Sequence, residues 1–108
     1  MTVELTSLER TCIETVAFVH WPDLRLDGIH VARREFTGIG AYIYLEDSHG
    51  QCLVDGVYEA GGRMIEMEGL RFGLDFALCV TSSRLDHIEL VAPGSTGWDG
   101  VTRPWRLL

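Results

Sequence analysis

The run FGLDFALCV at residues 72–80 constrains the fold more than any other part of the sequence. A large apolar side chain occupies every second position, and Asp75 or a small residue lies between them. Alternate residues of a strand point to the same face of a sheet, so this run predicts a strand with one apolar face. The residues on that predicted face are Phe72, Leu74, Phe76, Leu78 and Val80.

Residues 3–20 have a different period and predict a helix. Apolar residues recur there at steps of three and four, which places them on one stripe of a helix. Thr6 with Glu9 fits a capping box, and Thr2 is an alternative cap for an earlier start. The Trp21-Pro22 pair ends the helix, because the residue before a proline is pushed out of the helical region. The stripe consists of Leu5, Leu8, Cys12, Val16 and Val19, and Ile13, Ala17 and Phe18 widen it, so the second half should be largely buried.

Beyond residue 28 the pattern alternates, with turn signals about every ten residues and no second helix. Thr37-Gly38 and Ser82-Ser83 are predicted turns, residues 94–100 a loop, and residues 101–108 an edge strand or a packed tail around Trp105. The 108 residues therefore predict a single α+β domain, residues 1–108, with one N-terminal helix on an antiparallel meander of about five strands.

Composition narrows the classes of function. The net charge of −7 argues against direct nucleic-acid binding, which needs a basic surface, and suits a basic protein partner. The sequence contains neither an apolar run long enough for a membrane span nor a targeting segment, so a cytoplasmic location is expected. All nine basic residues are arginine, and the absence of lysine and asparagine points to a GC-rich, bacterial genome.

Residue types that carry chemistry form no recognisable motif. The chain has no CxxC, and Cys12 and Cys79 are interpreted as buried apolar residues. His49 with Cys52 is a conceivable catalytic pair, but no nearby feature marks either residue as activated. Arg33, Arg34 and Glu35, as neighbours in a strand, should point alternately to opposite faces. No catalytic residue, cofactor or metal site is therefore predicted.

The strand pattern divides the sheet into two faces. An apolar set should face the helix: Ile39, Ile43, Ile65, Met67, Leu74, Phe76, Ile88 and Leu90. The opposite face should then combine tyrosines with acidic groups, as protein interfaces often do. This candidate partner-binding set is Tyr42, Tyr44, Glu66, Glu68, Asp75, His87 and Glu89. The assignment depends on strand register, since a slip of one residue moves every side chain to the other face.

Two stretches, RREFTGIGAYIYL at residues 33–45 and GGRMIEMEGLRFGLDFALCV at residues 61–80, together with the strand near residues 85–91, carry a family resemblance. They resemble small bacterial proteins that contain REFTGVGF and a later block of the type GG-x-x-x-E-I-E-GL-x-x-G-x-x-F-x-LF. The chain departs from that pattern at Asp75 and in the loop 94–100. The resemblance implies a bacterial cytoplasmic α+β domain and assigns no catalytic residue.

These observations favour a non-enzymatic protein-binding module. The specific hypothesis is an immunity or inhibitor protein that neutralises a basic toxin or nuclease through the acidic, tyrosine-bearing face. One alternative is a small hydrolase or ligand-binding protein that uses Glu66, Glu68 or His87 in a cleft. Another is a homodimer that pairs sheet faces or edges, so the chain is expected to be a monomer or a homodimer.

Overall fold

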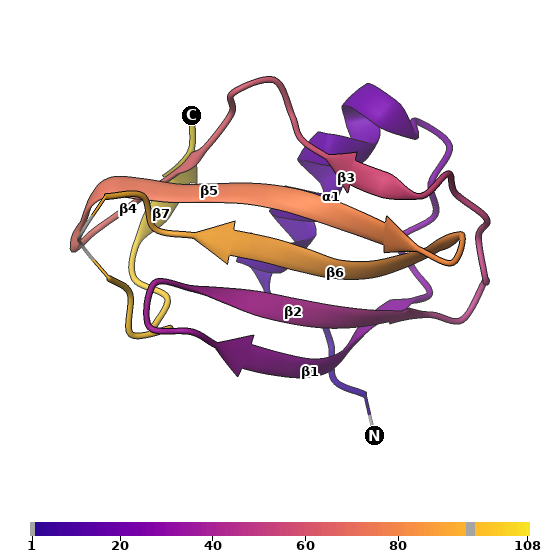
Figure 1. Cartoon of the computed structure of the whole chain (residues 1–108), viewed down its shortest axis with the longest axis horizontal. Coiled ribbons are helices and arrows are strands. Elements are labelled where there is room, and N and C mark those ends of the chain that lie inside the picture. The colour runs from indigo at the N-terminus through magenta and orange to yellow at the C-terminus, as the bar shows by residue number, and fades with distance from the viewer. Residues whose placement is uncertain (1, 95–96) are drawn as a thin grey trace.

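The computed structural model describes residues 2–94 and 97–108. The chain begins with one helix, α1 (Ser7–His20), and continues as strands β1 (Ile29–Phe36), β2 (Gly40–Asp47), β3 (Gly56–Tyr58), β4 (Ile65–Met67), β5 (Leu70–Thr81), β6 (Arg84–Val91) and β7 (Trp105–Leu107). Figure 1 shows α1 lying behind the sheet, and none of the described residues forms a helix on its front face. The predicted α+β architecture with an antiparallel sheet is confirmed.

The helix starts four residues later than residue 3. Thr6 is the N-cap and forms the capping box: its hydroxyl accepts from the Glu9 amide, and its own amide donates to the Glu9 carboxylate. The segment before it is extended instead, because Val3 forms a two-way backbone bridge with Val31 at the edge of β1. The helix ends at His20, as predicted from Trp21-Pro22.

Within residues 2–94 and 97–108 the sheet has seven strands in the order β1-β2-β6-β5-β4-β7, with β3 paired to β5 beside β4. The strand number is slightly higher than the predicted five, and the order differs from a simple meander because β6 lies between β2 and β5. The β1–β2 and β5–β6 hairpins lie side by side, because β6 pairs with β2 on one side and with β5 on the other. The C-terminal segment supplies an edge strand, β7, which pairs with β4.

The core lies between α1 and the back face of the sheet. Seven of the eight residues predicted to face the helix are buried: Ile43, Ile65, Met67, Leu74, Phe76, Ile88 and Leu90. Ile39 is the exception at 56% exposure, because the β1–β2 turn, not a strand, contains it. In the part of the chain that the structure describes, Glu9 is the buried charged residue, and Arg34 of β1 holds its carboxylate through two hydrogen bonds of 2.7 and 2.8 Å.

Two further expectations about burial are wrong. Phe72 is 49% exposed, because Gly73 takes a φ of +67° and interrupts the regular alternation of β5. Phe18 and Val19 are 84% and 57% exposed, although the helix pattern placed them in the buried half. Figure 1 shows the last turn of α1 extending past β3 at the edge of the sheet, so little of the sheet lies beneath it.

The predicted turn at Thr37-Gly38 joins β1 to β2, and it leads into a point where the backbones of β2 and β6 lie very close together. A Cβ on Gly40 would lie 1.9 Å from the carbonyl oxygen of Leu90, so only glycine allows β2 to reach β6 at this point.

Within the loop at residues 94–100, residues 95 and 96 lie outside the described part of the chain; Trp98 is buried against the core cluster. Among the described residues, no helix has the length and apolarity that a membrane span requires.

Candidate functional site

The face of the sheet turned away from α1 is the candidate site, and strand register assembles it. Tyr42 lies opposite Glu89, and Tyr44 lies opposite His87, across the β2–β6 pair. His87 in turn lies opposite Cys79 of β5, and Cys79 lies opposite Val57 of β3. One cross-strand row therefore brings together residues from positions 44, 57, 79 and 87 of the chain. We call this surface the outer face.

Three aromatic rings form its centre. The ring centroids of Tyr42 and Tyr44 lie 5.5 and 5.4 Å from that of His87, and 6.4 Å from each other. The Arg33 guanidinium stacks 3.8 Å above the Tyr44 ring and donates to Glu35 at 2.8 Å. The pair Arg33 and Glu35 thus shares this face while Arg34 points to the core, as their alternation predicted. All three rings are half-buried, which leaves apolar edges available to a partner.

Next to the aromatic rings lies a shallow hollow of about 300 Å³. Its apolar lining comes from Val57, Ala77 and Val91 together with Phe76, and its acidic lining comes from Glu59, Asp75 and Glu89. Val57 is 65% exposed, so an apolar floor reaches solvent between carboxylates. This combination matches a lysine or arginine side chain, whose apolar stem and charged end need different surroundings.

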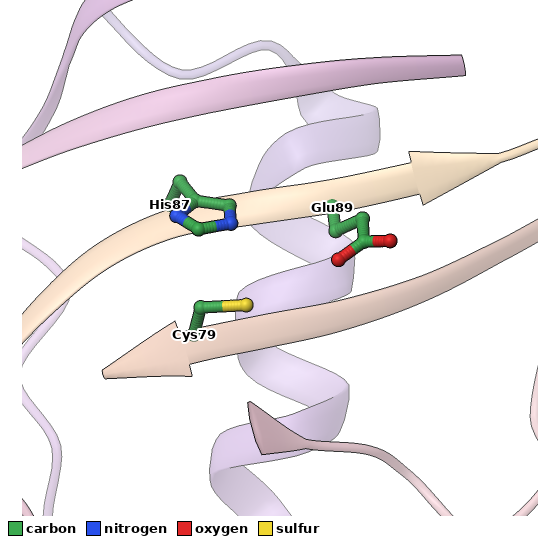
Figure 2. A group of neighbouring side chains, drawn as sticks. All are labelled: Cys79, His87 and Glu89. Atoms are coloured by element: carbon green, nitrogen blue, oxygen red, sulfur yellow. The ribbon is translucent and has the colours of Figure 1, made fainter. Parts of the chain in front are cut away.

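Between the rings and the hollow, three different metal-ligating groups converge. One donor atom each from Cys79, His87 and Glu89 lies within 4.8 Å of the others. Figure 2 shows the cysteine sulfur on β5 and the imidazole and carboxylate on β6 turned toward one another. The sequence predicted Cys79 to be a buried apolar residue. Its burial is confirmed at 8% exposure, and its side chain lies on the outer side of β5.

A β-bulge produces this arrangement. The register of the β5–β6 hairpin shifts between Cys79 and Val80, so that Cys79 lies opposite His87 and Val80 opposite Leu85. Asp86 is the extra residue of the bulge. Its carboxylate lies 2.7 Å from His87 Nδ1, which holds the imidazole ring in one orientation and leaves Nε2 free to face other groups.

Cys79, His87 and Asp86 are arranged like the nucleophile, base and carboxylate of a catalytic triad. The surroundings of the thiol, however, disfavour its ionised form. Burial, with the charges of Glu89 and Asp86 adding to it, raises the pKa of the Cys79 thiol. A catalytic cysteine needs the reverse, because the thiolate is the nucleophile. The thiolate of Cys79 is therefore disfavoured when no cation lies beside it.

The seven predicted site residues fall into two groups. Tyr42, Tyr44, His87, Glu89 and Asp75 lie around the aromatic cluster and the hollow. Glu66 and Glu68 line a separate hollow of about 340 Å³ at the β4–β7 end, together with Trp105 and Arg106. Glu66 is bound there by the Arg106 guanidinium at 3.0 Å.

The histidine–cysteine pair considered from the sequence is not assembled. His49 binds Asp27 at 3.1 Å through Nε2, while Cys52 is exposed on the loop that leads to β3. Sequence reasoning missed the Cys79–His87 pair instead. The two-residue turn at Ser82-Ser83 was a signal for it, since a tight hairpin brings residues 79 and 86 or 87 side by side.

Comparison with protein-family models, with curated proteins and with solved structures gives no match for this chain. The resemblance in residues 33–45 and 61–91 therefore assigns no family, and the function must be argued from the outer face itself.

Proposed function

We propose that this chain is a protein-binding module whose outer face binds a basic partner protein. The single observation that carries the proposal is the hollow with an apolar floor and acidic sides beside the aromatic cluster. Glu59, Asp75 and Glu89 supply its negative charge, and the chain as a whole carries −7. Such a surface attracts a positively charged partner over a distance and anchors it with tyrosine rings at contact.

In this proposal a lysine or arginine of the partner enters the hollow. Its methylene groups pack on Val57, Ala77 and Val91, and its charged end lies among the carboxylates. Tyr42 and Tyr44 contact the surface next to it. The specific form of the proposal is the neutralisation of a basic toxin or nuclease, because covering the basic substrate-binding surface of such a protein stops its activity.

The test compares wild-type protein with Tyr44→Ala and Asp75→Asn as baits in extracts of the source organism. The matched control is Glu14→Gln, a charge-neutralising change on the exposed side of α1. We expect the wild type and the control to capture a basic protein that salt releases. Both outer-face variants should fail to capture it. The purified partner should then lose its toxic or nuclease activity when the wild type is added.

Equal capture by all four proteins would overturn the binding surface. A partner that keeps full activity in the complex would overturn the inhibitor role. The homodimer alternative is separated by light scattering, where the proposal expects a monomer at the concentrations used for capture.

A further inference from the structure

We propose that Cys79, His87 and Glu89 bind a divalent transition-metal ion of the zinc type on the outer face, with Asp86 as the residue that positions His87. The site goes beyond the proposed protein-binding function and does not depend on it. It rests on three features of the described residues: the set of donors, the space between them and the orientation of the imidazole.

The donor set suits zinc chemistry. A thiolate, an imidazole and a carboxylate are the three ligand types that Zn²⁺ uses, and three protein ligands with an open position are typical of accessible zinc sites. Ca²⁺ and Mg²⁺ require mainly oxygen ligands and would not use Cys79. The proposed ion is therefore a borderline or soft divalent cation.

The distances are compatible with binding after a small closure. Zinc bonds of about 2.0–2.3 Å place tetrahedral ligand atoms about 3.3–3.8 Å apart. The three donor atoms now lie within 4.8 Å of one another, so no pair has to approach by more than about 1.0–1.5 Å. Glu89 can provide this movement, because its long side chain lies on the surface of β6, whereas Cys79 and His87 are held in facing positions by the ladder.

Ala77 leaves the space for the ion. It lies opposite Glu89 and two residues before Cys79 on the same side of β5, so the position next to the three donors carries only a methyl group. A larger side chain at this position would fill the site.

The imidazole is held as a metal ligand requires. Asp86 lies 2.7 Å from Nδ1, and the rings of Tyr42 and Tyr44 pack against the same imidazole. Metal-binding histidines commonly bind a carboxylate through their other ring nitrogen, which fixes the tautomer and strengthens the ligand. Nε2 is then the nitrogen that binds the ion, next to the Cys79 sulfur.

Co²⁺ titration of the metal-free protein tests the site, because a thiolate bound to Co²⁺ gives a charge-transfer absorption band. We expect one equivalent to bind with that band, and Zn²⁺ to displace it. Cys79→Ser should abolish the band, and His87→Gln and Glu89→Gln should each weaken binding at least tenfold. The matched controls Cys52→Ser and His49→Gln change the same residue types elsewhere and should bind as the wild type does.

Two further variants keep all three ligands. Asp86→Asn should retain the band but weaken binding by about 10- to 100-fold, as expected for a positioning residue. Ala77→Leu should block binding while its circular dichroism spectrum stays native.

Absence of the band in the wild type, its survival in Cys79→Ser or its loss in Cys52→Ser would overturn the proposal. Asp75→Asn changes the hollow but leaves the three ligands, Asp86 and both tyrosines in place, so it is expected to keep the metal. Failure of the metal site and failure of the protein-binding surface are therefore separately observable.

Discussion

The ion pair between Glu9 of α1 and Arg34 of β1 should be the most sensitive polar contact of the fold. The Glu9 carboxylate accepts two hydrogen bonds from the guanidinium, at 2.7 and 2.8 Å, and a third from the Thr6 amide at 2.8 Å. One side chain thus caps the helix and joins it to the sheet. Glu9→Ala removes both functions, whereas Glu9→Gln keeps an oxygen for the cap and removes only the charge.

The magnitude follows from burial. The Glu9 side chain is 5% exposed and that of Arg34 is 28% exposed. Removing one partner of a buried pair costs about 3–5 kcal/mol, but a guanidinium that reaches water recovers part of its hydration. The loss of the cap adds about 1 kcal/mol. We therefore expect Glu9→Ala to lower the free energy of unfolding by about 2–4 kcal/mol, and Glu9→Gln by about 1–2 kcal/mol.

Urea denaturation followed by circular dichroism measures these values, and a double-mutant cycle with Arg34→Met isolates the pair. The coupling energy should be about 1–2 kcal/mol. The control is Arg10→Gln with Glu14→Gln, an exposed helix pair at 3.7 Å that should contribute no more than about 0.5 kcal/mol. A coupling energy near zero for Glu9 and Arg34, or equal to that of the exposed pair, would refute the reasoning.

Three further predictions concern stability. Phe76→Ala should lower the free energy of unfolding by about 3–5 kcal/mol, because Phe76 is 5% exposed in the core; a loss below about 1 kcal/mol in urea denaturation would contradict its placement. Ser83→Gly should raise it by about 0.5–1 kcal/mol, since Ser83 has a φ of +64° in the β5–β6 turn and glycine adopts this conformation without strain; a higher urea midpoint checks this, and a lower one speaks against it. Burial, with the charge of Glu9 adding to it, raises the pKa of the Cys12 thiol from 9.0 to about 12. The unfolded thiol ionises first, so stability should fall by about 1.4 kcal/mol per pH unit between those values, relative to Cys12→Ala. A constant difference between the two proteins over that range of pH would contradict it.

Local pattern was sufficient for the main elements of the fold. The capping pair Thr6 and Glu9 and the Trp21-Pro22 stop delimit the helix, because caps and proline act through neighbouring backbone atoms. Alternation identified the buried side of β2 and β6, including Ile43 and Ile88. Such signals are contained within a few consecutive residues and do not depend on which strands later become neighbours.

The prediction of which side chains are buried was wrong where burial depends on how far the packing element extends, and at one position where a glycine changes the strand. The sequence pattern places Phe18 and Val19 on or beside the apolar stripe of α1. It does not indicate how far the sheet extends beneath that stripe. At Phe72 the cause is local, since the positive φ of Gly73 redirects the strand. A glycine in a strand is compatible with either a regular or a bulged backbone. In β5 the backbone is irregular at this point, where it pairs with β4.

The residues themselves determine that this chain has an acidic character, one amphipathic helix and strands with tyrosines opposite an apolar side. Which of these groups become direct neighbours on the outer face depends on the strand order and register, which the alternating pattern left open. With the regular register of a two-residue turn, Cys79 would lie opposite Asp86; the bulge instead places it opposite His87 and sets Asp86 beside the imidazole. The insertion of β6 next to β2 then brings Tyr42 and Tyr44 to the same histidine. One extra residue in a ladder moves every later side chain to a new partner, and the choice is made by the packing of the whole sheet on its core.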